Sequence, residues 1–269
     1  MLLAAALAVG VEAQNFPSQA IRLIAPFPPG GSVDITARLI AEPLGGELGT
    51  RVVVDNRSGA SGNIGMVATS PHVLVVHPRV PAGRLEDLVR LARARPGKLS
   101  YASAGVGTTF HLCGEMFKDS TGTFILHVPY RGGGPALLDT LAGQVDLSFP
   151  TLSAALPHVK AGTLRALAVT GITRSSQLPE VPTLQEAGVK DFQFTQWLAL
   201  LAPAGTSPAV VARLNSALRN ALNSKELREK FQAQAFEPFS TTPEDAGKFI
   251  ASEAQRLAKL IKTRGITAN

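Results

Sequence analysis

The chain has 269 residues, of which 45% are hydrophobic and 17% charged, enough to bury a core in one large domain or two modest lobes. Its formal net charge of +6 is spread along the sequence, and 6% of its residues are aromatic. This composition argues against nucleic acid as a partner, because such an interface needs clustered basic and stacking side chains. The single cysteine, Cys113, excludes an intramolecular disulfide and a cysteine-based zinc site. We expect Cys113 to be buried in an early helical turn.

Residues 1–13 (MLLAAALAVGVEA) are apolar apart from Glu12 and are too short to span a bilayer. They resemble the apolar region of a secretory signal peptide that is cleaved before about Gln14, although the usual basic start is missing. The alternative is an ordinary apolar first strand or a frayed helix. We favour the signal peptide, whose removal would leave the mature protein outside the cytoplasm.

Strands and helices alternate along the rest of the chain. Short apolar runs bounded by Gly and Pro predict strands at residues 21–27, 52–54, 73–76, 99–102, 124–128, 145–149, 166–169 and 197–202. Helical patterns lie at residues 35–44, 85–95, 109–117, 135–141, 207–223, 225–235 and 243–264. We expect Ser32 or Asp34 to cap the first helix, and a helix that starts at Ile64 to break off at Pro71. The three valines at 52–54 suit a strand covered on both faces, so the pattern predicts a parallel α/β fold.

Motifs for catalysis are missing from the sequence. The histidines form no H-E-x-x-H pair, and no G-x-S-x-G or G-K-[ST] motif occurs. Gly59, Gly62 and Gly65 follow a strand, but their order is wrong for a dinucleotide fingerprint and no acidic residue follows at the expected distance. We therefore predict a protein that is not an enzyme, with no catalytic residue, no metal ligand and no cofactor.

Four loops of small residues connect predicted strands to the segments that follow them, at residues 28–32, 58–63, 103–109 and 130–134. Each offers backbone N–H groups, hydroxyls and the positive end of a helix dipole, which together suit a small anion. In open α/β sheets such loops converge on the crevice at the carboxyl ends of the strands. The alternative is that they are tight turns that need glycine for a positive φ. Four such loops favour an anion-binding site.

Several ordered segments resemble the Bug-type receptors of the tripartite tricarboxylate transporter family. They are residues 26–34 (PFPPGGSVD), 56–65 (NRSGASGNIG), 98–105 (KLSYASAG), 127–132 (HVPYRG), 167–170 (LAVT), 179–183 (PEVPT) and 202–206 (APAGT). The resemblance covers nearly the whole chain, so it is specific for the family and much less so for the ligand.

The resemblance implies a periplasmic protein with a two-lobed α/β fold, the type II Venus-flytrap of periplasmic binding proteins. Residues 14–76 and 197–269 would form lobe I, and residues 77–196 lobe II. A small carboxylate or dicarboxylate would bind in the cleft between the lobes, for delivery to membrane permease subunits, and we expect a monomer. Ligand contacts carried over by position are Phe27, Pro29, Gly31, Ser32 and Asp34 from lobe I, and Ala104, Gly107, Thr108, Thr109, Tyr130, Arg131 and Gly132 from lobe II.

Other roles remain open for some of these residues. Phe27 and Tyr130 could instead pack in the core beside the cleft, and Asp34 could cap its helix, because its carboxylate would repel an anionic ligand. The chain also departs from the family pattern. Several tens of residues are missing after about Ser70, which should shorten lobe I and remove one wall of the cleft, and Pro150 replaces a residue that is often acidic.

Three alternative functions follow from these observations. The chain could be a ligand-sensing receptor that docks on a membrane sensor, or a family member that no longer binds a solute. The third alternative is a small-molecule enzyme that uses Asp34 or Asp146 in the cleft.

Overall fold

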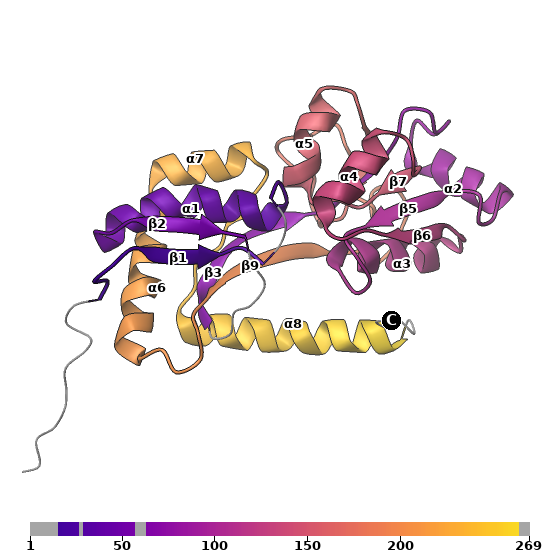
Figure 1. Ribbon diagram of the computed structural model, residues 1–269. Helices are drawn as coiled ribbons and strands as arrows, with labels where there is room; N and C mark the ends of the chain where they lie inside the picture. The colour runs from indigo at the N-terminus through magenta and orange to yellow at the C-terminus, as the bar shows by residue number, and fades with distance from the viewer. Residues whose placement is uncertain (1–15, 27–28, 57–62, 264–269) are drawn as a thin grey trace, which may run out of the picture.

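The computed structural model describes residues 16–26, 29–56 and 63–263, so the predicted signal peptide and Phe27 lie outside the described residues. The chain forms two α/β lobes with a waist of crossing strands between them (Figure 1). Three sheets are present in the described residues: β1-β2, β10-β3-β9 and β6-β5-β7-β4-β8. The two-lobed architecture expected from the sequence is therefore present.

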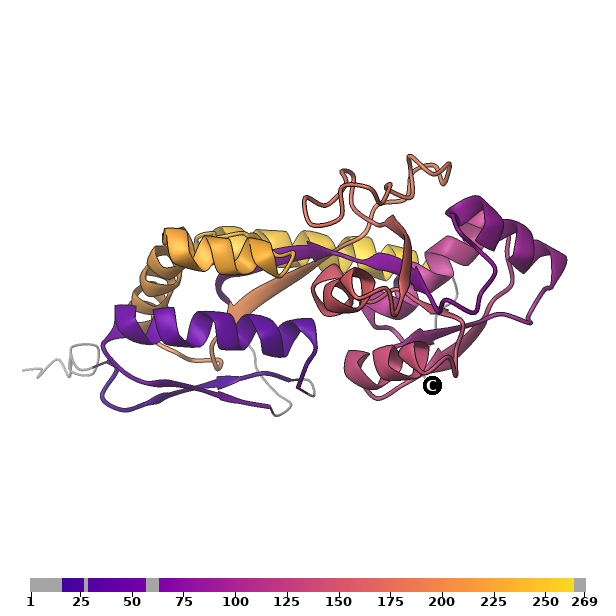
Figure 2. The ribbon, with the colours of Figure 1, turned by 90° about the horizontal axis from the view of Figure 1, so that it is seen from above.

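Lobe I is built on two parallel strands, β1 (Ile21–Ile24) and β2 (Val52–Asp55). Its helices are α1 (Ser32–Leu48), α6 (Pro208–Asn223) and α7 (Lys225–Ala233). Apolar side chains of α1 and α6, such as Leu44 and Leu218, share one core cluster with Phe231 of α7. Figure 2 shows α1 on one face of the strand pair, while the opposite face is open. The expectation that β2 is covered on both faces is wrong, since Val53 is 44% exposed.

Helix α1 continues through Gly45 and Gly46 to Leu48, further than the predicted end near residue 44. A β-carbon on Gly45 would lie 2.7 Å from the Thr50 carbonyl oxygen, so a glycine there allows the helix to pack closely on the following turn. The helix ends at Gly49, whose φ of 66° is typical of a left-handed C-cap.

Strand β3 (Asn63–Pro71) carries the chain from lobe I toward lobe II. It pairs antiparallel with β9 (Thr195–Leu201) and with β10 (Glu237–Pro238). The predicted helix start at Ile64 is therefore wrong. The apolar run there is too short for its period to distinguish helix from strand, and the strand conformation is set by pairing with β9. β3 runs through Ser70 to Pro71 as one strand.

Lobe II contains β4 (Val73–Val76), β5 (Ser100–Ser103), β6 (Leu126–Pro129), β7 (Leu147–Ser148) and β8 (Arg165–Val169). Its helices are α2 (Leu85–Ala94), α3 (Thr109–Thr121), α4 (Gly133–Leu141) and α5 (Leu152–Lys160). β5 is parallel to β6 and β7, but β4 is antiparallel to β7 and β8, so the sheet is mixed rather than wholly parallel. Because β4 belongs to this sheet, the change of sheet falls at His72, earlier than the division expected after Val76.

Helix α8 (Pro243–Thr263) lies alongside both lobes (Figure 1). Its last turns place Leu257, Leu260 and Ile261 against the core of lobe II. Cys113 is buried in α3, as predicted. No helix within the described ranges is both long and apolar enough to cross a membrane.

Candidate functional site: the cleft between the lobes

A cavity of about 520 Å³ lies where the two lobes face each other. Its walls come from the N-terminal ends of α1, α3, α4 and α5, from β9, and from α8. The lining residues are Gly30, Gly31, Ser32, Val33, Ala104, Val106, Gly107, Thr108, Thr109, Phe110, Gly133, Gly134, Leu137, Thr151, Ala154, Phe194, Thr195, Gln196, Trp197, Leu198, Glu253, Arg256 and Leu257. Four helix N-termini thus converge on one hollow.

None of these four helix starts is capped by its own side chain. The N-cap residues of α1, α3, α4 and α5 make no side-chain hydrogen bond to the first turn; they are Gly31, Thr108, Gly132 and Thr151. Helices α6 and α7, which begin away from the cleft, are capped by Ser207 and Ser224. The first N–H groups of an α-helix lack partners within the helix, and a helix N-terminus carries partial positive charge. The cleft therefore gathers unused donors that favour an anion.

The loop between β5 and α3 leaves the start of α3 without a side-chain cap. Gly105 and Gly107 adopt φ values of 126° and 78°, which favour glycine. The hydroxyl of Thr108 donates to the carbonyl oxygen of Gly105 at 2.7 Å, and it accepts no hydrogen bond from the first turn of α3. The small residues of this loop bring backbone amides to the cleft surface.

Charged side chains contribute little net charge to this cleft. Among its described lining residues, the charged ones are Glu253 and Arg256, which pair through two hydrogen bonds of 2.8 Å. This pairing lowers the pKa of Glu253 and raises that of Arg256. The guanidinium also lies 5.6 Å from the ring centroid of Phe194. Recognition of an anion here would depend mainly on backbone amides and hydroxyls.

Asp34 does not line this cavity, although it was an expected contact. Burial opposes ionisation of its carboxylate, but hydrogen bonds from Arg38, the Gly30 amide and Asn56 outweigh this effect and lower its pKa. The donor–acceptor distances are between 3.0 and 3.1 Å. Asp34 is therefore ionised, and its negative charge is balanced by Arg38. Its hydrogen bond from the Gly30 amide closes the turn before α1. The cap of this helix is Gly31, so neither Ser32 nor Asp34 caps it as predicted.

Six of the expected contacts line the cavity: Gly31, Ser32, Ala104, Gly107, Thr108 and Thr109. Five others do not: Pro29, Asp34, Tyr130, Arg131 and Gly132. Phe27 lies outside the described residues. Residues 130–132 instead support the β5–α3 loop from behind, because the Tyr130 amide donates to the Ser103 carbonyl oxygen at 2.9 Å and the Gly132 amide to that of Ala104 at 3.1 Å. In place of this turn, Gly133 and Gly134 reach the cavity.

Sequence reasoning missed the contribution of α5 and β9. Thr151 precedes a helix that escaped prediction because Pro157 lies inside it. Gln196 of β9 donates from Nε2 to the Ser32 hydroxyl oxygen at 2.9 Å, which links the crossing strand to the start of α1. Trp197, the single tryptophan of the chain, follows it in the cavity wall. The available signal was a polar pair, Thr195 and Gln196, at the start of an otherwise apolar strand.

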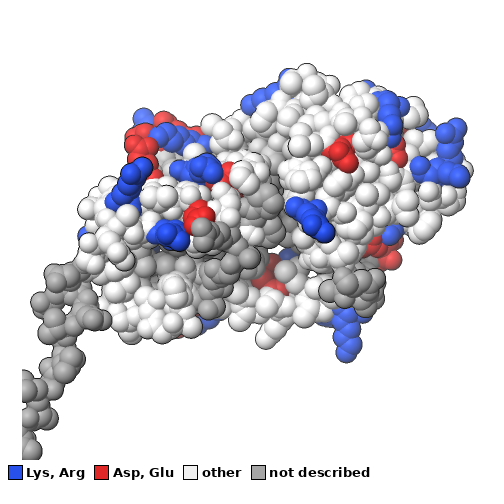
Figure 3. All heavy atoms as spheres, in the orientation of Figure 1, with Lys and Arg blue, Asp and Glu red and all other residues white. Residues whose placement is uncertain are grey.

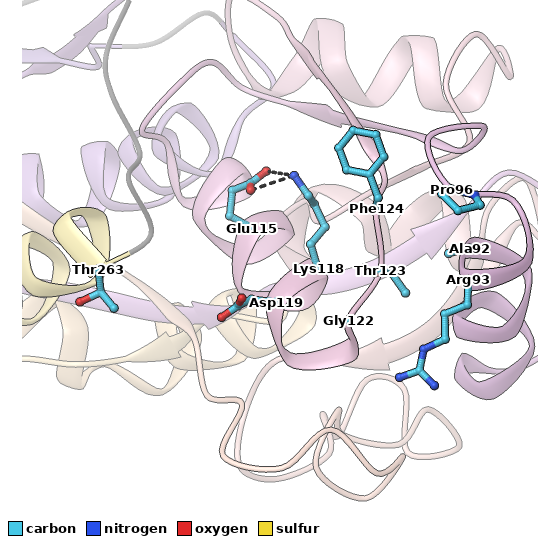
Figure 4. A pocket seen from close by; sticks show the side chains of 10 residues that line it. All are labelled: Ala92, Arg93, Pro96, Glu115, Lys118, Asp119, Gly122, Thr123, Phe124 and Thr263. Atoms are coloured by element: carbon cyan, nitrogen blue, oxygen red, sulfur yellow. Dashed lines mark hydrogen bonds and ion pairs between the residues drawn. The ribbon is translucent and has the colours of Figure 1, made fainter.

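A second, open hollow of about 800 Å³ lies on lobe II (Figure 4). It is lined by Ala92, Arg93, Pro96, Glu115, Lys118, Asp119, Gly122, Thr123, Phe124 and Thr263, which come from the C-terminal parts of α2, α3 and α8 and the segments beside them. Helix C-termini carry partial negative charge, unlike the N-termini that face the cleft. Within the part of the chain that the structure describes, no group of His, Cys, Asp and Glu is arranged to hold a metal ion. On the face shown in Figure 3, Lys and Arg are dispersed over both lobes without forming a stripe.

Comparison with known proteins agrees with this architecture. The family described as "Tripartite tricarboxylate transporter family receptor" matches residues 63–266. Protein BugT of Bordetella pertussis is 36% identical over 306 aligned positions, covering 97% of this chain and 94% of BugT. A UPF0065 protein from the tcbD-tcbE intergenic region of Pseudomonas sp. is 36% identical, covering 94% of this chain and 89% of that protein. Since 306 positions exceed the 269 residues here, the alignment with BugT includes residues that this chain lacks.

Solved structures of similar proteins share the two-lobed fold. R. palustris Rpa4515 with adipate has a TM-score of 0.89 and 31% identity, over 94% of this chain and 99% of that one. The periplasmic binding protein BugD has a TM-score of 0.88 and 27% identity, over 94% and 100% of the two chains. The fold and the cleft define a solute-binding protein of the periplasmic-binding-protein class. More particularly, the chain belongs to the receptor family of tripartite tricarboxylate transporters.

Proposed function

We propose that this chain captures a small carboxylate or dicarboxylate in the cleft and delivers it to the membrane permease subunits of a tripartite transporter. The observation that carries this proposal is the convergence of four uncapped helix N-termini on one cavity. Helix N-termini bind anions without a charged side chain. This agrees with a cleft in which Arg256 is paired with Glu253.

The division of these helix ends between the lobes relates binding to closure. α1 belongs to lobe I, whereas α3, α4 and α5 belong to lobe II. A dicarboxylate can place one carboxylate at each side and so stabilise the closed arrangement by its differential affinity for it. The similarity to Rpa4515, whose structure contains adipate, supports a linear dicarboxylate as the first ligand to test.

The remaining parts of the proposal concern location and assembly. We expect the mature protein to act in the periplasm as a monomer, following removal of residues 1–13. Receptor membership in the transporter family supports a role in transport. Docking on a membrane sensor is the alternative use of the same closed state.

Calorimetric titration of the purified protein with adipate and with its uncharged diamide tests the binding proposal. We expect adipate to bind and the diamide to bind much more weakly, because the amide ends lack the charge that the helix ends favour. If neither adipate nor any of a panel of other linear dicarboxylates binds or raises the melting temperature, the proposal is wrong. The chain would then match the alternative of a family member that no longer binds a solute.

A further inference from the structure

Two histidines lie directly behind the cleft loop, which we define as residues 103–109. His111 comes from α3 and His127 from β6, and their rings are stacked with centroids 4.1 Å apart and planes inclined by 14°. The Gly107 amide of the loop donates to Nδ1 of His111 at 3.0 Å. Nε2 of His127 lies 2.6 Å from the Ser103 hydroxyl oxygen, which also accepts from the Gly105 amide at 3.1 Å. Each imidazole thus holds one part of the loop.

The contact with Gly107 fixes the protonation state of His111. An amide N–H can be accepted only by a ring nitrogen that carries a lone pair, so Nδ1 is unprotonated and the ring is neutral with its proton on Nε2. That Nε2 lies 3.8 Å from Oε1 of Glu115. A proton on Nδ1 would face the Gly107 N–H with a second N–H, and the hydrogen bond would be lost.

The charged groups beside the pair act in opposite directions, because Glu115 favours a positive charge on the rings and Lys118 opposes it. On α3, Glu115 is already engaged by Lys118 at 2.8 Å and by the Tyr101 hydroxyl at 2.6 Å. Figure 4 shows the Glu115 and Lys118 side chains meeting on α3. On β5, the ring of Tyr101 stacks on His127 at 4.8 Å. Two imidazolium rings in contact would also repel each other, so the pair accepts at most one proton readily.

We propose that His111 is a positioning residue of the ligand cleft, whose neutral imidazole holds the Gly107 amide and thereby the loop that presents Thr108 and Thr109 to a bound carboxylate. The proposal rests on the proposed function of the cleft. It makes capture of the ligand dependent on pH: affinity falls as His111 takes up a proton. Gly107, Thr108 and Thr109 all line the cavity, whereas His111 lies behind it and is 7% exposed.

The direction of the pH effect follows from the environment of the pair. Burial is the main cause that lowers the pKa of His111, while Glu115 raises it and Lys118 lowers it. Burial also lowers the pKa of His127, to about 4, with a further contribution from His111. At neutral pH both rings are therefore neutral and the loop is held. The loop is released as His111 takes up a proton, at a pH below the ordinary pKa of histidine.

Nuclear magnetic resonance of the ligand-free protein tests the positioning itself. We expect the ¹⁵N–¹H shift of the Gly107 amide to follow the titration of the His111 ring with the same pKa. The variant His111→Asn places a non-titrating amide oxygen close to the position of Nδ1, so its Gly107 shift should not change over that range. A Gly107 shift that is independent of the His111 titration would overturn the proposal.

Adipate binding measured against pH tests the consequence. The affinity of the unsubstituted protein, divided by that of His111→Asn, should fall as the pH is lowered through the pKa of His111 and level off once the contact with the Gly107 amide is lost. This ratio removes the protonation of adipate itself. His111→Ala removes the acceptor and should bind adipate more weakly already at pH 7.5. Its affinity divided by that of His111→Asn should not change with pH. Far-ultraviolet circular dichroism checks that all proteins remain folded.

A matched control is available at His77, whose Nδ1 accepts the Arg79 amide at 3.2 Å in a turn that does not line the cleft. His77→Asn should keep the pH profile of the unsubstituted protein. If adipate binds but the profile of His111→Asn coincides with that of the unsubstituted protein, the inference fails and the proposed function stands. If adipate binds no protein at pH 7.5 although Gly107 follows His111, the loop contact is supported and the proposed function fails for this ligand.

Discussion

Mild acid should destabilise the fold through His72, which lies where the chain passes from β3 to β4. This residue is completely buried, and its Nδ1 lies 2.8 Å from the carbonyl oxygen of Phe149. Because a carbonyl oxygen can only accept, Nδ1 carries the proton in the neutral ring. Its Nε2 has no hydrogen-bond partner, and its ring meets those of Phe110 and Phe194 edge-on. A second proton would place an unpaired charge among aromatic rings.

The size of the effect follows from the two pKa values of His72. Burial lowers its pKa in the folded protein from 6.5 to about 4, in spite of backbone hydrogen bonds that act in the opposite direction. The unfolded chain therefore binds the proton first, so stability is fully present above pH 6.5 and is lost progressively as the pH falls to about 4. A single group with these two values removes about 2.5 kcal/mol of unfolding free energy between pH 8 and pH 4.5.

Urea titrations at pH 8 and pH 4.5, on the unsubstituted protein and on His72→Asn, measure this contribution. Asparagine can still donate to the Phe149 carbonyl but cannot titrate. The His72→Asn variant should therefore lose about 2.5 kcal/mol less unfolding free energy between the two pH values than the unsubstituted protein does. Contributions of the other histidines are common to both proteins and cancel. Should the variant not fold, the His72 ring resonances provide the test, because they should not titrate above about pH 5. Equal losses in both proteins, or a ring that titrates near pH 6.5, would refute the reasoning.

Three further predictions concern other parts of the molecule. Gly45→Ala should cost about 1–3 kcal/mol of unfolding free energy, because its β-carbon would meet the Thr50 carbonyl oxygen at 2.7 Å; the neighbouring Gly46→Ala, with nothing within 4 Å, should be neutral or stabilising by up to about 1 kcal/mol in urea melts. Adipate should change the fluorescence of Trp197, the single tryptophan and part of the cleft wall, and an unchanged emission spectrum with bound ligand would contradict the cleft as the site. Cys113 is fully buried and burial raises its thiol pKa, so Ellman's reagent should react with it only after unfolding; rapid reaction with the folded protein would disprove this burial.

Local patterns predicted most elements of the fold, and the misses have physical causes. The predicted bounds of the amphipathic helices of the C-terminal half agree with the structure to within two residues. A helical period that repeats over a long segment is easily distinguished from that of a strand. The run at Ile64 was misread, since its strand conformation depends on pairing with β9, about 130 residues later in the chain. Strand direction in lobe II was also beyond local patterns: β4 has a buried sequence typical of parallel sheets but is antiparallel to both neighbours.

The cleft was predictable where its residues belong to glycine-rich loops after strands. Ser32, Gly107 and Thr108 follow such turns, and the structure brings them to one cavity. Contacts from β9 and α8 could not be foreseen in this way, because they reach the cleft only through the crossing of strands between the lobes. Asp34 is the opposite case: it was expected as a contact because it follows a ligand loop, but it does not line the cavity, and its carboxylate accepts hydrogen bonds from Arg38 and Asn56.

A change at Thr109 tests most directly whether backbone amides hold the ligand. Thr109 is the first residue of α3, where proline is well tolerated, and Thr108 before it has an extended backbone with φ −72° and ψ 163° that suits a following proline. Thr109→Pro removes one amide N–H from the cleft, while Thr109→Val removes the hydroxyl alone. Lys225→Pro makes the same change at the start of α7, away from the cavity, and serves as the control.

The measurement is the calorimetric affinity for adipate of these three variants. A hydrogen bond to a charged group contributes about 1.5–3 kcal/mol, so Thr109→Pro should bind adipate at least about tenfold more weakly than Thr109→Val, and Lys225→Pro should bind as the unsubstituted protein does. Equal affinities of Thr109→Pro and Thr109→Val for adipate would contradict anion binding by the uncapped start of α3.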